Sequence, residues 1–274
     1  MTVRQGLTPS SSQFRKRLMN IRLLGAHNCE SESTKPTSLL IDDTLAIDAG
    51  AITSSLSFEA QQNIKAVLLT HQHYDHVRDV PSLAMNLFLH DARTTVYTIP
   101  TVYEIVTTHL LDGEIYPSLH QRPSPNPILE FNIIEPLKPE LIEGYSVLAV
   151  PVSHRVPAVG YQVTSPDGKI VFHTGDTGPG LAECWRQVSP QLLIIEVTAP
   201  DRYKEAAVKA GHLSPSLLKE ELISFREIKG YLPRVVTVHM NPPLEKEIAA
   251  EVRTIEKELG CSITVGCEGM ELKL

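Results

Sequence analysis

The sequence lacks the features of several protein classes. No stretch of its 274 residues approaches the ~18 consecutive apolar residues of a membrane-spanning helix, and its first residues lack the apolar core of a secretory signal. The four cysteines, Cys29, Cys184, Cys261 and Cys267, are scattered and form no Cys-x-x-C pair, which argues against a disulfide framework. We therefore expect a soluble cytoplasmic protein without a membrane partner, whose thiols are free and mostly buried.

Positive charge is also scarce. The 25 Lys and Arg residues stand against 32 Asp and Glu residues, for a net charge of -7, so a long polyanion such as nucleic acid is not the favoured partner. The basic stretch FRKRLMNIR, residues 14–22, is expected to be a solvated tail that leads into the first strand, with residues 1–17 as a flexible tail. No linker divides the middle of the chain, which predicts a single domain over residues 1–274.

Short apolar, β-branched runs dominate both halves of the chain, and helical patterns punctuate them. This order predicts an α/β fold in which two mixed β-sheets pack face to face with helices outside, a four-layer αβ/βα sandwich. The helical patterns cover residues 77–91, 213–230 and 242–260. The expected strands are 20–25, 37–42, 44–50, 64–71, 95–99, 129–135, 145–152, 159–165, 169–175, 191–197 and 234–240.

Residues 111–127, LDGEIYPSLHQRPSPNP, interrupt this pattern. They hold too many prolines to continue a helix or to form a central strand. A surface loop is the default expectation, and a lid that covers the substrate is the alternative.

The stretch LLTHQHYDHVRDV, residues 68–80, is the most specific chemical signal. His71 and His73 alternate at the end of an expected strand, so both side chains leave the same face and can share one cation. Asp75 and His76 follow where the chain turns toward a helix, and they supply a second, neighbouring set of ligands. Imidazoles and a carboxylate suit zinc, with iron or manganese as alternatives. A lone His-x-His could be two surface histidines, whereas the full block predicts a metal site.

Further candidate ligands stand at the ends of other expected strands. His154 lies in LAVPVSHRV, His239 in VVTVHMNPP and Asp176 in IVFHTGDTGPG, which lacks the Gly-Lys-Ser/Thr ending of a phosphate-binding P-loop. His212, in KAGHLSPS, is a fourth polar candidate. The other histidines are expected to be structural or surface residues: His27, His90, His109, His120 and His173.

From Asp48 in LAIDAG to His239, these ordered motifs resemble the metallo-β-lactamase-fold hydrolases across nearly the whole chain. The resemblance implies two divalent metal ions, Zn²⁺ first, with Mn²⁺ or iron as alternatives. It implies that Asp176 bridges the two metals and that Asp48 orients a histidine ligand. The other ligands it implies are His71, His73 and His154 for the first metal, and Asp75, His76 and His239 for the second.

Glu196, at the end of LLIIEV, and His212 indicate one branch of this family. The pair resembles the glutamate and the non-ligand histidine of the branch that contains ribonuclease Z and class II cyclic-nucleotide phosphodiesterases. There the histidine, oriented by the glutamate, assists departure of the leaving oxygen, because an alkoxide leaves a phosphodiester poorly unless it is protonated or metal-bound. The expected catalytic residues are Asp75, His212 and Glu196. Without the resemblance, His212 is a surface or capping residue beside Ser214, and Glu196 a strand-end carboxylate.

The main hypothesis is a two-metal phosphodiesterase in which a hydroxide held between the metals attacks phosphorus. A small phosphodiester is the expected substrate, with a lean toward a cyclic nucleotide because HLLDGEIYPSL, residues 109–119, weakly resembles those phosphodiesterases. A ribonuclease Z-type tRNA endonuclease is disfavoured by the net charge of -7 and by the lack of a long tRNA-gripping arm.

Two other activities stay open at the level of the sequence. One is a carboxylic-ester, thioester or lactone hydrolase that uses the same metals. The other is a non-hydrolytic diiron protein that binds oxygen, against which His73 argues, because that branch usually has a glutamate at this position. The oligomeric state is not determined by the sequence, which is compatible with a homodimer.

Overall fold

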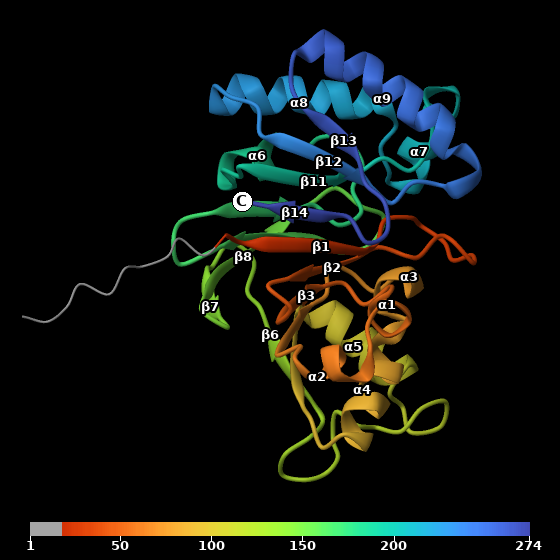
Figure 1. Cartoon of the computed structure of the whole chain (residues 1–274), viewed down its shortest axis with the longest axis vertical. Helices are drawn as coiled ribbons and strands as arrows, with labels where there is room; N and C mark the ends of the chain where they lie inside the picture. Colours follow the sequence, from red (N-terminus) through yellow and green to blue (C-terminus); the bar gives the residue numbers. More distant parts are fainter. Residues whose placement is uncertain (1–17) are drawn as a thin grey trace, which may run out of the picture.

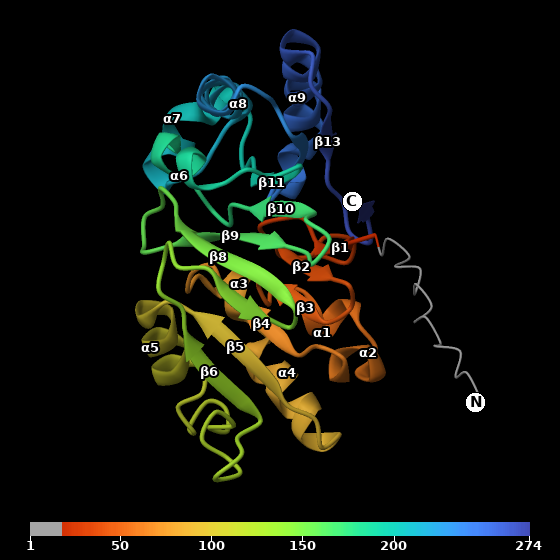
Figure 2. The same cartoon turned by 90° about the vertical axis from the view of Figure 1, so that its left-hand side faces the viewer.

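The computed structural model describes residues 18–274 and shows two β-sheets packed face to face, with helices on the outer side of each (Figures 1 and 2). These four layers confirm the αβ/βα sandwich predicted from the alternation of strand and helix patterns. The tail expected over residues 1–17 lies outside the described residues.

The first sheet contains the N-terminal strands together with the last strand of the chain. Its strands are β1 (Asn20–Gly25), β2 (Ser38–Ile41), β3 (Leu45–Ile47), β4 (Ala66–Leu68), β5 (Thr94–Thr98), β6 (Leu129–Ile133) and β14 (Glu271–Lys273). They lie in the order β14-β1-β2-β3-β4-β5-β6. The strands from β3 to β6 are parallel and the other pairs are antiparallel, so the sheet is mixed.

The second sheet is mixed in the same way. Its strands are β7 (Glu140–Ile142), β8 (Tyr145–Pro151), β9 (Val159–Thr164), β10 (Ile170–His173), β11 (Leu192–Glu196), β12 (Arg234–Val238) and β13 (Ile263–Val265). They lie in the order β13-β12-β11-β10-β9-β8-β7. The strands from β10 to β13 are parallel, and β7 to β10 are antiparallel neighbours.

Helices cover the outer face of each sheet (Figure 1). Beside the first sheet lie α1 (Ile52–Ser55), α2 (Phe58–Gln62), α3 (Tyr74–Val77), α4 (Asp79–Leu89) and α5 (Pro100–His109). Beside the second lie α6 (Ala182–Gln187), η1 (Asp201–Tyr203), α7 (Lys204–Ala210), α8 (Pro215–Lys229), η2 (Pro242–Leu244) and α9 (Glu245–Leu259). None of the helices within residues 18–274 is long and apolar enough to cross a membrane.

The fully buried strand β11 shows why the sheets stack. Leu192 and Ile194 belong to the apolar core between the two sheets, whereas Leu193 and Ile195 belong to the core under the outer helices, which includes Trp185. A strand that is buried on both faces reads as a continuous apolar run, as LLIIE does. Because both sheets contribute to one inter-sheet core, we propose that the chain forms a single domain.

Every strand expected from the sequence is present, and three further strands were missed. The missed strands are β7, β13 and β14, of three residues each, which are too short to show an alternating pattern. No bounds were predicted for the helices α1, α2, α3, α5, α6 and α7; in α5, whose last residue His109 falls on a helical pattern, the many β-branched residues of PTVYEIVTTH favour strands and obscure its extent. The three expected helices correspond to α4, α8 and α9.

Residues 111–127 form a surface loop at the end of the first sheet that is far from the histidine block. The carbonyl of Leu119 accepts the backbone N–H of Ile128, whose own carbonyl accepts the N–H of Thr94 at the start of β5. Since β4 and β5 are parallel, His71 follows the opposite end of these strands. The loop accordingly lies below the sandwich in Figures 1 and 2, away from α3, which argues against its role as a substrate lid.

Gly25, at a register shift between β1 and β2, has no room for a side chain. A Cβ atom there would lie 1.9 Å from the carbonyl oxygen of Pro36 and 2.8 Å from that of Lys35. Gly25→Ala must therefore push these backbones apart. We expect the free energy of unfolding, measured by urea denaturation, to fall by about 1–3 kcal/mol, the usual effect of overpacking. A variant as stable as the wild type would contradict this close approach.

Candidate metal centre

Polar side chains collect at one edge of the sandwich, where strands of both sheets end. His71 and His73 follow β4, Asp176 follows β10 and His239 follows β12, while His154 lies after β8. The carboxyl ends of neighbouring parallel strands meet at one sheet edge, which is where α/β proteins commonly place their sites. The face-to-face packing of the sheets then brings residues that are more than a hundred positions apart into one cluster.

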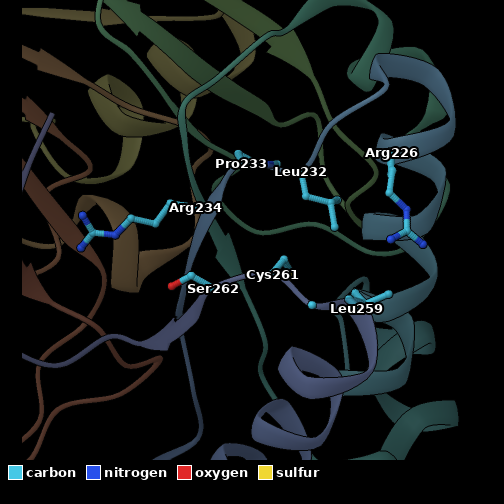
Figure 3. Close-up of a pocket in the computed structure, with 8 residues that line it drawn as sticks. Arg226, Leu232, Pro233, Arg234, Leu259, Cys261 and Ser262 are labelled. Atoms are coloured by element: carbon cyan, nitrogen blue, oxygen red, sulfur yellow. The ribbon is translucent and has the colours of Figure 1, made fainter.

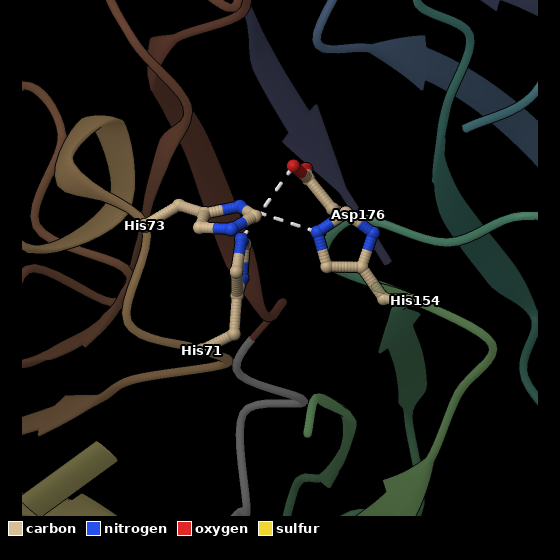
Figure 4. Close-up of side chains that lie close together, drawn as sticks. All are labelled: His71, His73, His154 and Asp176. Carbon is tan, nitrogen blue, oxygen red and sulfur yellow. Dashed lines mark hydrogen bonds and ion pairs between the residues drawn. The ribbon is translucent and has the colours of Figure 1, made fainter. Parts of the chain in front are cut away.

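The first cluster joins the three histidines expected for the first metal to Asp176. One potential ligand atom from each of His71, His73, His154 and Asp176 lies within 4.8 Å of the others. Nδ1 of His73 is 3.2 Å from Nε2 of His154, and Nε2 of His71 is 3.6 Å from Oδ2 of Asp176 (Figure 4). The ligand atoms of a tetrahedral zinc ion are roughly 3.4 Å apart when each bond is about 2.0–2.1 Å, so this cluster could close around one cation.

The second cluster contains Asp75, His76, His239 and again Asp176. Nε2 of His76 is 3.1 Å from Oδ1 of Asp176, and Nε2 of His239 is 3.3 Å from its Oδ2. Nε2 of His239 is also 3.2 Å from Oδ2 of Asp75. Asp176 therefore faces both clusters, one carboxylate oxygen toward His76 and the other toward His71 and His239.

Asp48 places a carboxylate behind both clusters. It is fully buried, and its Oδ2 accepts the Nδ1–H of His76 at 2.8 Å. The hydroxyl of Thr70 donates to both oxygens of Asp48, at 3.0 and 2.9 Å. Because a hydroxyl has a single proton, Thr70 Oγ1 must accept the Nδ1–H of His71, which is 3.0 Å away. Asp48 thus orients both histidines through Nδ1 and leaves each Nε2 facing the centre, where a neutral ring would offer a lone pair.

Glu196 repeats this arrangement on the other side of the centre. It is fully buried, and its Oε1 accepts the Nδ1–H of His212 at 2.7 Å. Its Oε2 accepts the hydroxyl proton of Thr198, also at 2.7 Å. Thr198 Oγ1 lies 2.9 Å from Nδ1 of His239, which must therefore be the donor. Glu196 orients the predicted catalytic histidine directly and a predicted ligand through Thr198.

Two threonines take part in the hydrogen bonds of the candidate site and were not predicted from the sequence. Thr70 directly precedes His71, and Thr198 follows Glu196 by two positions. These placements beside a histidine and a carboxylate were the available signal. Threonine is common near strand ends, however, so neither position stood out before the hydrogen bonds were known.

A glycine determines how His154 is held. The Nδ1–H of His154 donates to the carbonyl of Gly211 at 2.9 Å. Gly211 ends α7 in the left-handed conformation, with φ of 82°, and a Cβ atom there would lie 3.0 Å from Nδ1 of His154. Because Gly211 directly precedes His212, the same turn positions a predicted ligand and the predicted catalytic histidine.

The residues present fit divalent cations. Nε2 of His71, Nε2 of His76 and Oδ1 of Asp176 are buried, and none of them makes a hydrogen bond of regular geometry among the described residues, although the last two atoms lie 3.1 Å apart. A buried polar atom without a partner is unfavourable, and a bound cation would supply that partner. The imidazole and carboxylate donors suit zinc, and they are also compatible with manganese or iron.

The family comparison covers this entire set of residues. The model of the beta-lactamase superfamily domain matches residues 44–240, which include every predicted ligand as well as Glu196 and His212. The chain belongs to the beta-lactamase superfamily. A comparison with curated proteins gives no match.

Solved structures show the fold of this superfamily. Unliganded yeast PDE1 has a TM-score of 0.82 and 17% identity, over 94% of this chain and 99% of that one. The metallo-beta-lactamase-fold protein YhfI from Bacillus subtilis has a TM-score of 0.75 and 16% identity, over 94% and 100%. Human short-form tRNase Z has a TM-score of 0.66 and 18% identity, over 93% and 98%. At these identities the three neighbours show that the fold is shared, and no more.

The electrostatics of the superfamily site favour positive charge at its centre. Burial raises the pKa of Asp176, but His239 and His76 outweigh it and hold that pKa well below its usual range. Burial lowers the pKa of His76, whereas Asp176 and Asp48 raise it well above its usual range. The carboxylates that favour a proton on His76 would equally favour a cation beside its Nε2.

The backbone is strained at two positions of the site. Asp48 has φ of 60° and His239 has φ of 63°, in the left-handed region that residues other than glycine seldom adopt. Backbone hydrogen bonds hold both: the N–H of Asp48 donates to Leu68, and that of His239 to Ala26. Such conformations persist where the surroundings enforce them, and they cluster at functional sites.

A separate hollow of about 470 Å³ lies at the other end of the second sheet (Figure 3). Leu232 and Leu259 line it near the ends of α8 and α9, together with Arg226 and Arg234, whose guanidinium groups point in different directions. Arg234 begins β12, and His239 follows the last residue of that strand. The hollow is thus remote from the polar cluster, and it contains none of the predicted catalytic residues.

The shared position of Asp176 leads to a metal-binding prediction. Asp176→Ala removes the only residue that faces both clusters among those described, so we expect the variant to retain one equivalent of metal or less. Metal content after dialysis would be measured by elemental analysis. Asp167→Ala, in an exposed turn, is the matched control and should bind as the wild type does. Two equivalents on the Asp176→Ala protein would contradict the bridging assignment.

Proposed function

We propose that the chain is a dinuclear-metal-dependent phosphodiesterase that acts on a small phosphodiester, with a cyclic nucleotide as the leading candidate. The pairing of Glu196 with His212 carries this proposal. The His212 ring lies 5.2 Å from that of His154 and 5.3 Å from that of His239, between centroids. An oriented histidine therefore stands beside both predicted metal positions while its Nδ1 is engaged by Glu196.

The two cations and their ligands are part of the proposal. When bound, they would activate the attacking water and offset the charge on the phosphate oxygens. The side chain of Asp75 is 28% exposed, in contrast to the 3% of Asp176, so Asp75 can orient the attacking water from the open side of the centre. The first cation would bind to His71, His73, His154 and Asp176, and the second to Asp75, His76, His239 and Asp176.

His212 has the properties of a proton donor. Burial lowers its pKa, but the charge and hydrogen bond of Glu196 raise that pKa to about 9, which favours a proton on the ring. Glu196 occupies Nδ1, which leaves Nε2 for the departing oxygen of a substrate. A positioned acid of this kind lowers the barrier to expulsion of an alkoxide.

The need for such a donor favours a phosphodiester over a thioester. A thiol has a pKa of about 8.5, so a thiolate leaves without protonation, whereas an alkoxide does not. Carboxylic esters and lactones also expel an alkoxide, so the donor does not distinguish them from a phosphodiester, and the substrate panel below separates them from the main proposal.

The position of the proline-rich loop favours a small substrate over a folded RNA. Residues 111–127 lie at the end of the first sheet that is opposite to His71, so they are not placed to grip a large substrate at the site. The net charge of -7 also gives little general attraction for a polyanion. A nucleic-acid partner is therefore not favoured.

The role of His212 can be separated from metal binding. His212→Ala should keep its metal content and slow phosphodiester cleavage by roughly a hundredfold or more, the usual effect of losing a positioned acid. His90→Ala, which removes an exposed histidine outside the centre, is the control and should cleave at the wild-type rate. Loss of metal from His212→Ala would instead make His212 a ligand, since it also groups with Asp176, Glu196 and His239.

A substrate panel on protein of known metal content tests the activity itself. We expect cleavage of bis(p-nitrophenyl) phosphate and of at least one cyclic nucleotide by the metal-loaded enzyme. Cleavage of thioesters, carboxylic esters or lactones, without any phosphodiester, would overturn the proposal. Two bound irons with an oxygen-dependent visible band and no turnover would indicate the oxygen-binding alternative.

A further inference from the structure

His173 is a buried polar residue in an apolar layer. The sequence analysis assigns it to the structural or surface histidines, and the structure leaves it 1% exposed at the end of β10. Neither of its ring nitrogens has a hydrogen-bond partner among the described residues. A phenylalanine would fill a similar volume without burying two polar atoms, so the imidazole calls for an explanation beyond packing.

The alternation of β10 turns His173 toward the interface between the sheets. Val171, two residues earlier, belongs to the inter-sheet core, whereas Phe172 packs with Trp185 in the core under the outer helices. His173 shares the face of Val171. Its Nε2 lies 3.8 Å from Oδ2 of Asp48, which follows β3 of the other sheet. The contact therefore joins the two sheets behind the proposed metal centre.

Asp48 is the residue through which His173 reaches that centre. Oδ2 of Asp48, the oxygen nearest to His173, is also the atom that accepts the Nδ1–H of His76. The other contacts of the Asp48 carboxylate come from the backbone and the hydroxyl of Thr70, so they all lie on the first sheet. His173 is the partner of this carboxylate from the second sheet.

We propose that His173 is a positioning residue for the second cation, held by Asp75, His76, Asp176 and His239: it directs a ring N–H at Asp48 and thereby fixes the carboxylate that presents His76. At 3.8 Å the contact is longer than a hydrogen bond, so it acts through charge and dipole, which are strong in a buried, low-dielectric layer. The inference rests on the metal centre of the proposed function and not on its substrate.

The burial of Asp48 agrees with this role. Its side chain is fully buried, and its Oδ2 lies 2.8 Å from Nδ1 of His76 and 3.8 Å from Nε2 of His173. A fully buried carboxylate needs such partners to stay ionised, and an ionised carboxylate orients a histidine ligand better than a neutral one.

The experiment measures cation affinity, independent of turnover. Metal-free wild type and His173→Phe would be titrated with Zn²⁺ in competition with a chromophoric chelator, and with Co²⁺ to follow its visible bands. We expect His173→Phe to weaken binding of the second equivalent by about 10–100-fold, the usual effect of losing a partner behind a ligand. His173→Gln retains an N–H donor and should recover part of that loss.

Two controls separate positioning from a general loss of structure. Thr94→Val removes another buried, unpartnered oxygen at the far end of the first sheet and should bind both equivalents as the wild type does. In an Asp48→Asn background, His173→Phe should weaken the second equivalent by less than about twofold, because its effect passes through Asp48. Thermal unfolding of the metal-free variants reports whether each is folded.

Each outcome decides the inference. Unchanged affinity in His173→Phe, or the same factor of loss with Asp48→Asn as without it, would overturn it. A wild type that binds fewer than two equivalents would overturn the metal centre and this inference together. A wild type that binds two equivalents but cleaves no phosphodiester would overturn the proposed activity alone. The metal titrations of the His173 variants would then still decide whether His173 positions Asp48.

Discussion

The rest of the site depends on the contacts of the Asp176 carboxylate, which lies between two groups of imidazoles. Its oxygens lie within 3.1–3.6 Å of the Nε2 atoms of His76, His239 and His71. Those nitrogens come from two different sheets, and each points toward the centre, where a neutral ring would offer its lone pair to a cation. Because Asp176 belongs to both clusters, it joins them into one centre. Gly175, which precedes it, has φ of 60° and allows the backbone to turn there.

Two carboxylates outside the ligand set orient the histidines of this centre in the same way. Asp48 accepts a hydrogen bond from His76 directly and orients His71 through Thr70. Glu196 accepts a hydrogen bond from His212 directly and orients His239 through Thr198. The two arrangements differ in what they orient. Asp48 acts on predicted ligands alone, whereas Glu196 acts on a predicted ligand and on the predicted acid, which links the geometry of metal binding to that of proton transfer.

The accuracy of sequence-based prediction followed the length and pattern of each element. Long apolar runs such as LLIIE, and helices with a glycine stop such as α9, were recognised because many residues repeat one period. The strands β7, β13 and β14 were missed because three residues are too few to show an alternating pattern of apolar and polar side chains. They form by pairing with the edges of the longer strands. The β-branched residues of α5 favour a strand and obscured the extent of this helix, which tertiary packing stabilises.

The sequence by itself predicted a metal site at the strand ends, because a block such as His-x-His-x-Asp-His has few other uses and its partners stand at the ends of recognisable strands. The seven predicted ligands lie in two clusters that share Asp176. Only the tertiary structure decided which atoms face one another, and with it the roles of Thr70, Thr198 and His173. The contacts of the two threonines depend on the pairing of strands that are far apart in the chain, and that of His173 depends on the stacking of the two sheets; a local sequence pattern specifies neither.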